Sequence, residues 1–96
     1  MHTMVGLISI NSCASIYTYL FTYRSTWGCP KSKFDWTYSD QETAYLIKGL
    51  VTVTPKNKSV FGDAVTVKAG DIVTFPAGMD CVWDVQEDLH KHYRFD

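Results

Sequence analysis

Apolar side chains recur at every second position through most of the chain from residue 17 onward. Such alternation predicts β-strands with one face toward a core. The apolar runs are 17–23, 34–38, 45–53, 65–67, 72–75, 81–85 and 91–95. Between them lie Gly, Pro, Asn and Asp, which favour turns. No window has a convincing helical period. Roughly seven or eight short strands at this spacing predict an all-β sandwich or barrel.

A barrel is the more economical arrangement for so short an all-β chain. Closing the sheet removes the unpaired strand edges that would otherwise promote aggregation. Closure also creates an interior, and aromatic side chains on its walls would make that interior a small-molecule site.

The composition limits the classes of function. A chain of 96 residues has room for one domain. Nine basic and ten acidic side chains give a net charge of −1 without a basic stripe, which argues against a nucleic-acid partner. Cys13, Cys29 and Cys81 are widely spaced, as is usual for free thiols in a reducing compartment. We therefore expect a cytoplasmic protein without a disulfide framework.

The first 26 residues differ from the rest of the chain, because they contain one arginine and no acidic residue. They lack the arginine content of a transit peptide and the basic start and unbroken apolar run of a signal peptide. No stretch approaches the ~18–20 apolar residues that span a membrane, so we expect no membrane association. Residues 1–26 are interpreted as a leading strand or an unusual N-terminus rather than as a targeting segment.

One spacing pattern is specific. Glu42 is followed after six residues by Gly49, and Gly70 is followed after five by Pro76, then by Gly78. Gly49 lies within a strand pattern, where glycine marks a bulge or a close backbone approach. Gly70 precedes Asp71 at a turn that favours positive φ. Pro76 ends the strand before it.

This spacing resembles the two-part signature of the cupin superfamily. The segments WGCPKSKFDWTY, ETAYLIKGLVTVTP, AGDIVTFPAGMDCVWDV and KHYRF resemble the small single-domain subgroup related to the (S)-ureidoglycine aminohydrolase cupin domain. The resemblance extends over residues 27–95. It implies an RmlC-like jelly-roll β-barrel over residues 27–96. It also implies that a homodimer can form through an exchanged or added strand, for which the aromatic segment 17–23 is a candidate.

The metal ligands of the superfamily are largely replaced. Aligned on the signature, Trp36 and Tyr38 stand at the two His-x-His positions and Cys81 at the third histidine position, so that only Glu42 remains. Replacement of three imidazole ligands should weaken transition-metal binding far more than changes to the residues around the ligands, which alone cost ~10–100-fold in affinity. An irregular site of Glu42, Cys81 and Tyr38 is the alternative. We expect no metal and no other cofactor.

The matching positions are expected to face into the barrel. The predicted pocket consists of Phe34, Trp36, Tyr45, Cys81 and Trp83, together with Tyr38 and Glu42. Flat apolar walls with a few polar tips suit a small planar molecule.

The two polar groups of this pocket have alternative interpretations. Glu42 as acid or base and Tyr38 as its partner would support enolisation or double-bond isomerisation. Alternatively, Glu42 accepts backbone hydrogen bonds at a strand bend and its neighbours fill the barrel.

Other reactive side chains have a structural interpretation beside the functional one. Cys81 has acidic neighbours in the sequence, which favours buried packing over a reactive thiolate. His90 and His92 share one face of the last strand and are either surface residues or a metal pair. Lys91 would orient an acidic ligand if it faced the interior, but its direction does not follow from the sequence.

Three functions remain open. The first is a metal-free cupin that binds a small organic molecule and catalyses isomerase- or cyclase-like proton transfer with Glu42 and Tyr38. The second, implied by the resemblance, is a metal-dependent hydrolase of a small ureide, which the missing histidines disfavour. The third is a non-catalytic binding or interaction protein.

Overall fold

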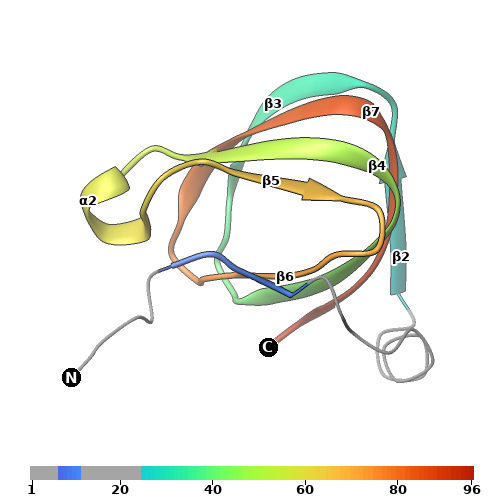
Figure 1. Cartoon of the computed structure of the whole chain (residues 1–96). Coiled ribbons are helices and arrows are strands. Elements are labelled where there is room, and N and C mark those ends of the chain that lie inside the picture. Colours follow the sequence, from blue (N-terminus) through green and yellow to red (C-terminus); the bar gives the residue numbers. More distant parts are fainter. Residues whose placement is uncertain (1–6, 12–24) are drawn as a thin grey trace.

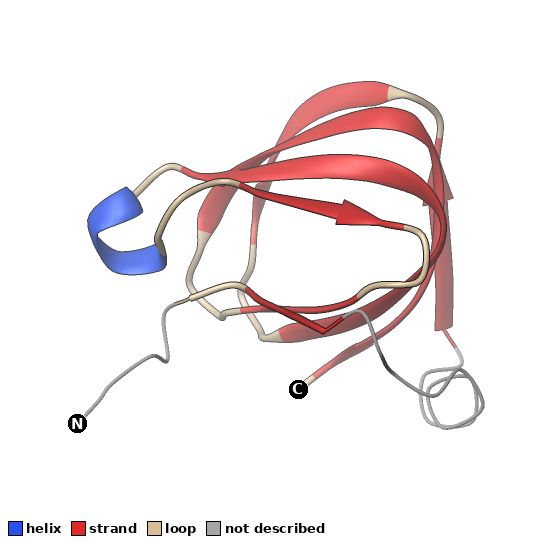
Figure 2. Cartoon of the chain, in the orientation of Figure 1, coloured by secondary structure: helices blue, strands red, loops and turns tan. Residues whose placement is uncertain are grey.

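The computed structural model describes residues 7–11 and 25–96. These residues form β1 (Ser9–Asn11), β2 (Ser25–Cys29), β3 (Ser32–Thr37), β4 (Glu42–Pro55), α2 (Lys58–Phe61), β5 (Val65–Lys68), β6 (Ile72–Phe75) and β7 (Asp80–Phe95). Most of the described chain is strand, and the short helix α2 lies at one end of the curved sheet (Figures 1 and 2). The predicted all-β fold is confirmed. The segment 17–23 lies outside the described residues.

The two longest strands organise the barrel. In the described part of the chain the sheet has seven strands in the order β1-β6-β4-β7-β2, while β3 also pairs with β7 and β5 with β4. All of these pairings are antiparallel. Strands β4 and β7 pair from Glu42↔Phe95 to Pro55↔Cys81. They therefore run across the whole sheet, as Figure 1 shows.

Strand β7 is longer than the sequence pattern suggests. The alternation predicts two strands, 81–85 and 91–95, because the segment Gln86–Asp88 between them is polar. The structure has one continuous strand from Asp80 to Phe95, in which Gln86–Asp88 are exposed. The backbone there continues to pair with β4, through Leu50↔Glu87, so the ladder does not depend on side-chain polarity.

A β-bulge interrupts β4 near Gly49. The pairing of β4 with β7 shifts register between Leu46 and Val51, and Gly49 has φ +111°. A Cβ at Gly49 would lie 2.8 Å from both Asp88 O and Leu89 Cα. This confirms the prediction that Gly49 marks a bulge or close backbone approach.

The bulge corrects one sequence expectation. The pattern 45–53 assigns Tyr45, Ile47 and Val51 to one face. In the structure, Leu46 is buried and Ile47 is 38% exposed, whereas after the bulge Val51 is buried again. The inward face thus changes from even to odd positions, because a one-residue register shift moves every following side chain to the opposite face.

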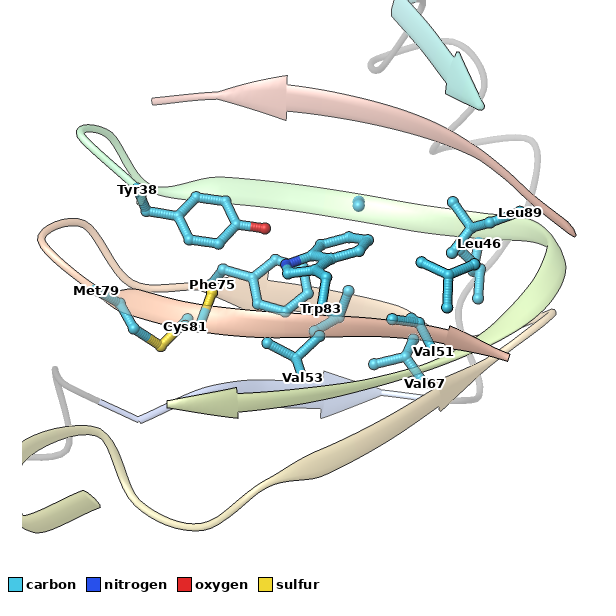
Figure 3. Packing of buried hydrophobic residues seen from close by; sticks show 13 residues of the cluster. Tyr38, Leu46, Val51, Val53, Val67, Phe75, Met79, Cys81, Trp83 and Leu89 are labelled. Carbon is cyan, nitrogen blue, oxygen red and sulfur yellow. The ribbon is translucent and has the colours of Figure 1, made fainter. Parts of the chain in front are cut away.

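The buried core lies between the strands of the curved sheet (Figure 3). It contains aliphatic side chains from β4, β5 and β7 and a group of stacked aromatic rings. The rings of Tyr38 and Phe75 stack at 5.1 Å, and Phe75 meets Trp83 at 5.6 Å. Leu46 and Leu89 lie at the opposite end of the cluster (Figure 3). Such aromatic pairs contribute about 0.5–1.5 kcal/mol each beyond their burial, so they also stiffen the wall from which Tyr38 and Trp83 project.

Candidate functional site

A cavity of about 130 Å³ opens beside this aromatic group. Its apolar lining consists of Trp27, Phe34, Trp36, Trp83, Tyr93 and Phe95. Its polar lining consists of Tyr38, Glu42 and Lys91. A cavity of about 150 Å³ holds a benzene molecule in another protein. The site therefore has the size of a single six-membered ring.

The rim and the floor of the cavity differ in exposure. Trp27, Trp36 and Phe95 are 37–47% exposed and form the rim. Tyr38 and Glu42, by contrast, are each 1% exposed and form part of the floor. A ligand would therefore enter between exposed rings and meet its polar partners only inside.

The register of β2 and β3 on β7 places the walls. Phe34 pairs with Trp83 and Trp36 with Cys81 across β3 and β7, and the rings of Phe34 and Trp83 stack at 6.0 Å. Trp27 of β2 pairs with Lys91, and the Trp27 and Trp83 rings meet edge to face at 6.1 Å. Successive inward positions of β7 thus supply one side of the cavity.

Glu42 and Lys91 form an ion pair inside the cavity. The Nζ atom of Lys91 donates to Oε2 of Glu42 at 2.5 Å, and the two side chains are 8% and 1% exposed. Glu42 is the first residue of β4, and Lys91 lies in the second half of β7. The sequence analysis left the direction of Lys91 open and treated Glu42 as a carboxyl among apolar rings. The structure gives that carboxyl a cationic partner.

Aromatic rings surround the lysine. Its Nζ lies 4.7 Å from the centroid of Trp83, 5.1 Å from Trp27 and 5.5 Å from Tyr93. The negative faces of such rings attract a cation. Burial nevertheless lowers the pKa of Lys91, and the carboxylate of Glu42 opposes that shift. The ammonium is thus held by one carboxylate and by rings rather than by water.

Three buried polar atoms at the cavity make no hydrogen bond of ordinary geometry with the described residues, although weaker hydrogen-bonding contacts of Tyr38 with Glu42 and Trp83 contribute to the pKa of Tyr38. The three atoms are the Tyr38 hydroxyl, Oε1 of Glu42 and Nε1 of Trp83. Buried polar groups are normally paired, so an unpaired group needs an explanation. Figure 3 shows the Tyr38 hydroxyl directed toward the Trp83 ring. All three residues line the cavity.

Tyr38 stays protonated. Burial, first, and the nearby carboxylate of Glu42, second, raise the pKa of Tyr38 far above its usual value. A phenol with a raised pKa donates a hydrogen bond and releases no proton in the ordinary pH range. Tyr38 is therefore a donor at this site.

Two predicted pocket residues lie outside the cavity lining. Tyr45 is half-buried on β4, opposite Ile72 and His92, because the even positions face inward before the bulge. Cys81 is fully buried, and its Sγ contacts the carbonyl oxygen of Trp36 at 3.5 Å. Burial raises the pKa of Cys81 to about 11, so this side chain is an inert thiol of the core.

The donor set does not fit a cupin transition metal. No group of three His, Cys, Asp or Glu side chains in residues 7–11 and 25–96 is placed to hold a metal ion. Glu42 is already paired with Lys91, and Cys81 contacts the Trp36 backbone. His90 and His92 stack at 6.4 Å and alternate with the inward-facing Lys91. We therefore derive no step through a metal.

Sequence reasoning missed Trp27, Tyr93 and Phe95 and left Lys91 undecided. The available signal was parity, because Cys81, Trp83, Leu89 and Lys91 are all buried odd positions of one strand. The polar segment 86–88 concealed the continuity of that strand.

In the described part of the chain, no helix is both long enough and apolar enough to cross a membrane.

The chain is similar to known domains. A family described as the EutQ-like cupin domain matches residues 21–93. A DUF861-family protein of Thermotoga maritima is 32% identical, with a TM-score of 0.80, and the match covers 93% of this chain and 99% of the other. No curated protein matches the chain.

Two further structures match at lower identity. The EutQ protein of Clostridium difficile is 21% identical with a TM-score of 0.62, and the match covers 73% of this chain and 52% of the other. A DUF861-family protein of Pseudomonas syringae is 25% identical with a TM-score of 0.62, over 74% of this chain and 29% of the other. This chain thus corresponds to about half of EutQ, and the similarity to EutQ concerns the fold alone.

Proposed function

Since this chain belongs to the family of EutQ-like cupin domains, we propose that its barrel binds a small planar organic molecule in the cavity that holds Glu42 and Lys91. The predicted cupin fold is confirmed by this membership. The closer resemblance to the ureidoglycine aminohydrolase cupin domain remains a proposal, and it requires a metal that the donor set does not fit.

One observation carries the proposal. The Tyr38 hydroxyl, Glu42 Oε1 and Trp83 Nε1 are buried in residues that line one cavity, and none of the three atoms makes a hydrogen bond of ordinary geometry with a described residue. Leaving such a group unsatisfied costs about 1–3 kcal/mol. A ligand with one acceptor and one donor would satisfy these groups, and the ring walls would cover its faces.

The reaction we propose is metal-free proton transfer. Oε2 of Glu42 is occupied by Lys91, which leaves Oε1 to accept a proton from a bound ligand. Tyr38, kept protonated by burial and by Glu42, would donate a hydrogen bond to the oxygen on which negative charge develops. Enolisation and double-bond isomerisation need this combination of a base and a donor. A binding protein without catalysis is the alternative.

The test compares phenol with toluene, two molecules of similar shape that differ in one hydroxyl. Binding is followed by the indole N–H resonance of Trp83 in nitrogen–proton NMR spectra, assigned with Trp83→Phe. We expect phenol to bind about tenfold tighter or more, since a hydrogen bond to a charged group contributes about 1.5–3 kcal/mol. Equal affinities, or shifts only at residues outside the cavity, would contradict the proposal.

Two variants sharpen this comparison. Tyr38→Phe removes one unpaired hydroxyl without burying a new charge and should reduce the preference for phenol. Glu87→Gln changes an exposed carboxyl on β7 and should leave the preference for phenol intact.

A second experiment tests catalysis by following the exchange of the acidic α-proton of a cyclic ketone for deuterium in heavy water. Exchange that exceeds the buffer rate and is lost in Tyr38→Phe supports proton transfer. Tight binding without exchange supports the non-catalytic alternative.

A further inference from the structure

The amine of Lys91 is the one nucleophile in the cavity lining that the proposed proton transfer does not use. Its side chain is 8% exposed, and Lys91 lines the same cavity as Tyr38, Glu42 and Trp83. The other groups of that lining are rings, the Tyr38 phenol and a carboxylate. The pocket thus places a primary amine beside a carboxylate and has room for one ring. This arrangement is suited to covalent capture of a carbonyl compound.

Lys91 Nζ donates a hydrogen bond to Oε2 of Glu42. That bond gives the proton of the ammonium a direct path to the carboxylate. Removing both charges from water is costly, and the neutral acid–amine pair avoids that cost. Burial also lowers the pKa of Lys91, which favours the free amine. When the proton moves to Glu42, the lone pair of Nζ becomes available inside the cavity.

The remaining polar groups suit a carbonyl oxygen. Tyr38 O–H and Trp83 Nε1–H are buried donors that make no hydrogen bond of ordinary geometry with the described residues. A carbonyl oxygen accepts two hydrogen bonds, as do backbone carbonyls. Two donors next to a nucleophile resemble the arrangement that stabilises the negative charge formed when a carbonyl is attacked.

We propose that Lys91 forms an imine with a small aldehyde or ketone bound in this cavity. The inference rests on the proposed small-molecule site and names its substrate class. Nζ attacks the carbonyl carbon, and the π electron pair moves to oxygen. Glu42, which has taken one proton from the ammonium, supplies it to that oxygen, and takes a second proton from the new C–N nitrogen.

The second half of the step releases water. Glu42 protonates the hydroxyl of the carbinolamine, the C–O bond breaks, and the nitrogen lone pair forms the C=N bond. The products are a protonated imine, one water molecule and the Glu42 carboxylate, so the net change is condensation with loss of water. The positive imine keeps Glu42 as its counter-ion and the surrounding rings as its cation-binding wall.

The test traps the imine in the folded protein. The chain is incubated with benzaldehyde and cyanoborohydride at neutral pH, digested, and mapped by mass spectrometry for benzyl groups on each lysine. An ordinary lysine is neutral in only about one molecule in 2,500 at pH 7. We expect Lys91 to be labelled at least tenfold faster than Lys56, an exposed lysine paired with Asp35. In urea this preference should disappear. Labelling of Lys91 no faster than of Lys56 would overturn the inference.

Two variants and one binding measurement separate the possible failures. Lys91→Arg keeps a cation but has no primary amine, so the fast label should be lost. Glu42→Asp keeps a carboxyl at a greater distance and should slow the label without abolishing it; an unchanged rate would overturn the role of Glu42. Benzaldehyde without reductant is also tested for its shift of the Trp83 indole resonance. A shift without trapping overturns only the imine, whereas no shift and no trapping overturn the binding site as well.

Discussion

Lys91 near the end of β7 donates a hydrogen bond to Glu42 at the start of β4, at 2.5 Å, in a cavity walled by aromatic rings. The two residues are 49 positions apart in the chain. The pairing of β4 with β7, from Glu42↔Phe95 onward, brings them together. The ion pair is therefore a product of the long ladder between the two strands that organise the barrel.

Breaking the pair from either side should be strongly destabilising. Lys91→Met leaves a buried carboxylate, and Glu42→Gln leaves a buried ammonium, and each loss typically costs about 3–5 kcal/mol. The double variant removes both charges. Its free energy of unfolding should lie within about 1–2 kcal/mol of the wild-type value or exceed that value. Urea unfolding of the four proteins measures this cycle.

The exposed pair Lys56–Asp35 is the matched control. Its atoms lie 2.9 Å apart, but the side chains are 49% and 72% exposed, and Lys56→Met should change stability little because water screens such pairs. If the effects of Lys91→Met and Glu42→Gln simply added in the double variant, the two side chains would not be coupled.

Tyr38 should make the fold sensitive to alkaline pH. Its pKa is raised in the folded state by burial and by Glu42. Above the ordinary tyrosine pKa of about 10, the unfolded chain therefore loses a proton that the folded chain keeps. The unfolded state is then favoured, and the free energy of unfolding falls by up to about 1.4 kcal/mol per pH unit.

Tyr38→Phe removes this dependence. The difference in unfolding free energy between the wild type and Tyr38→Phe should be constant at about pH 8 and shift in favour of the variant by about pH 11. The lowered pKa of Lys91 makes the free energy of unfolding rise with pH below the usual lysine pKa. The wild type and Tyr38→Phe share that contribution, so it cancels in their difference. Parallel pH profiles would mean that Tyr38 ionises as readily in the folded protein as in the unfolded one.

Gly49→Ala and Gly70→Ala should differ in cost. Both glycines have positive φ, +111° and +96°, which disfavours any L side chain by roughly 1–2 kcal/mol. The two positions differ in the room for a Cβ atom. At Gly70 a Cβ would meet nothing within 4 Å, whereas at Gly49 it would lie 2.8 Å from the β7 backbone. We expect a clearly lower melting temperature for Gly49→Ala than for Gly70→Ala. Equal melting temperatures would show that β7 moves aside at the bulge at no cost.

Metal removal should leave the protein unchanged. We expect substoichiometric metal by elemental analysis of protein purified without an affinity histidine tag. Dialysis against a chelator should not alter the melting temperature, because a bound metal would stabilise the fold in proportion to its affinity. Near-stoichiometric manganese, iron, nickel or zinc whose removal lowers the melting temperature would instead support the metal-dependent hydrolase.

The sequence by itself determined the class of fold and the position of the site along the chain. Alternation with period two predicted strands of a sandwich or barrel, and the spacing of Glu42, Gly49, Gly70, Pro76 and Gly78 carried the resemblance that implied the cupin barrel. These signals are local, since a strand pattern, a bulge glycine and a turn are each recognisable within a few residues. Tyr38 and Glu42, predicted from the motif, and Trp83, predicted from the alternation, line one cavity.

Only the tertiary structure decided which side chains meet in that cavity. The bulge at Gly49 moved Tyr45 away from it, and the unbroken course of β7 through its polar segment turned Lys91 toward it. The direction of Tyr45 does not follow from local pattern, because the register shift at the bulge puts inward residues before and after it on opposite parities. The direction of Lys91 follows from the parity of β7 only when that strand is known to be continuous. The partner of Glu42 is therefore set by cross-strand register, a property of two strands and not of either one alone.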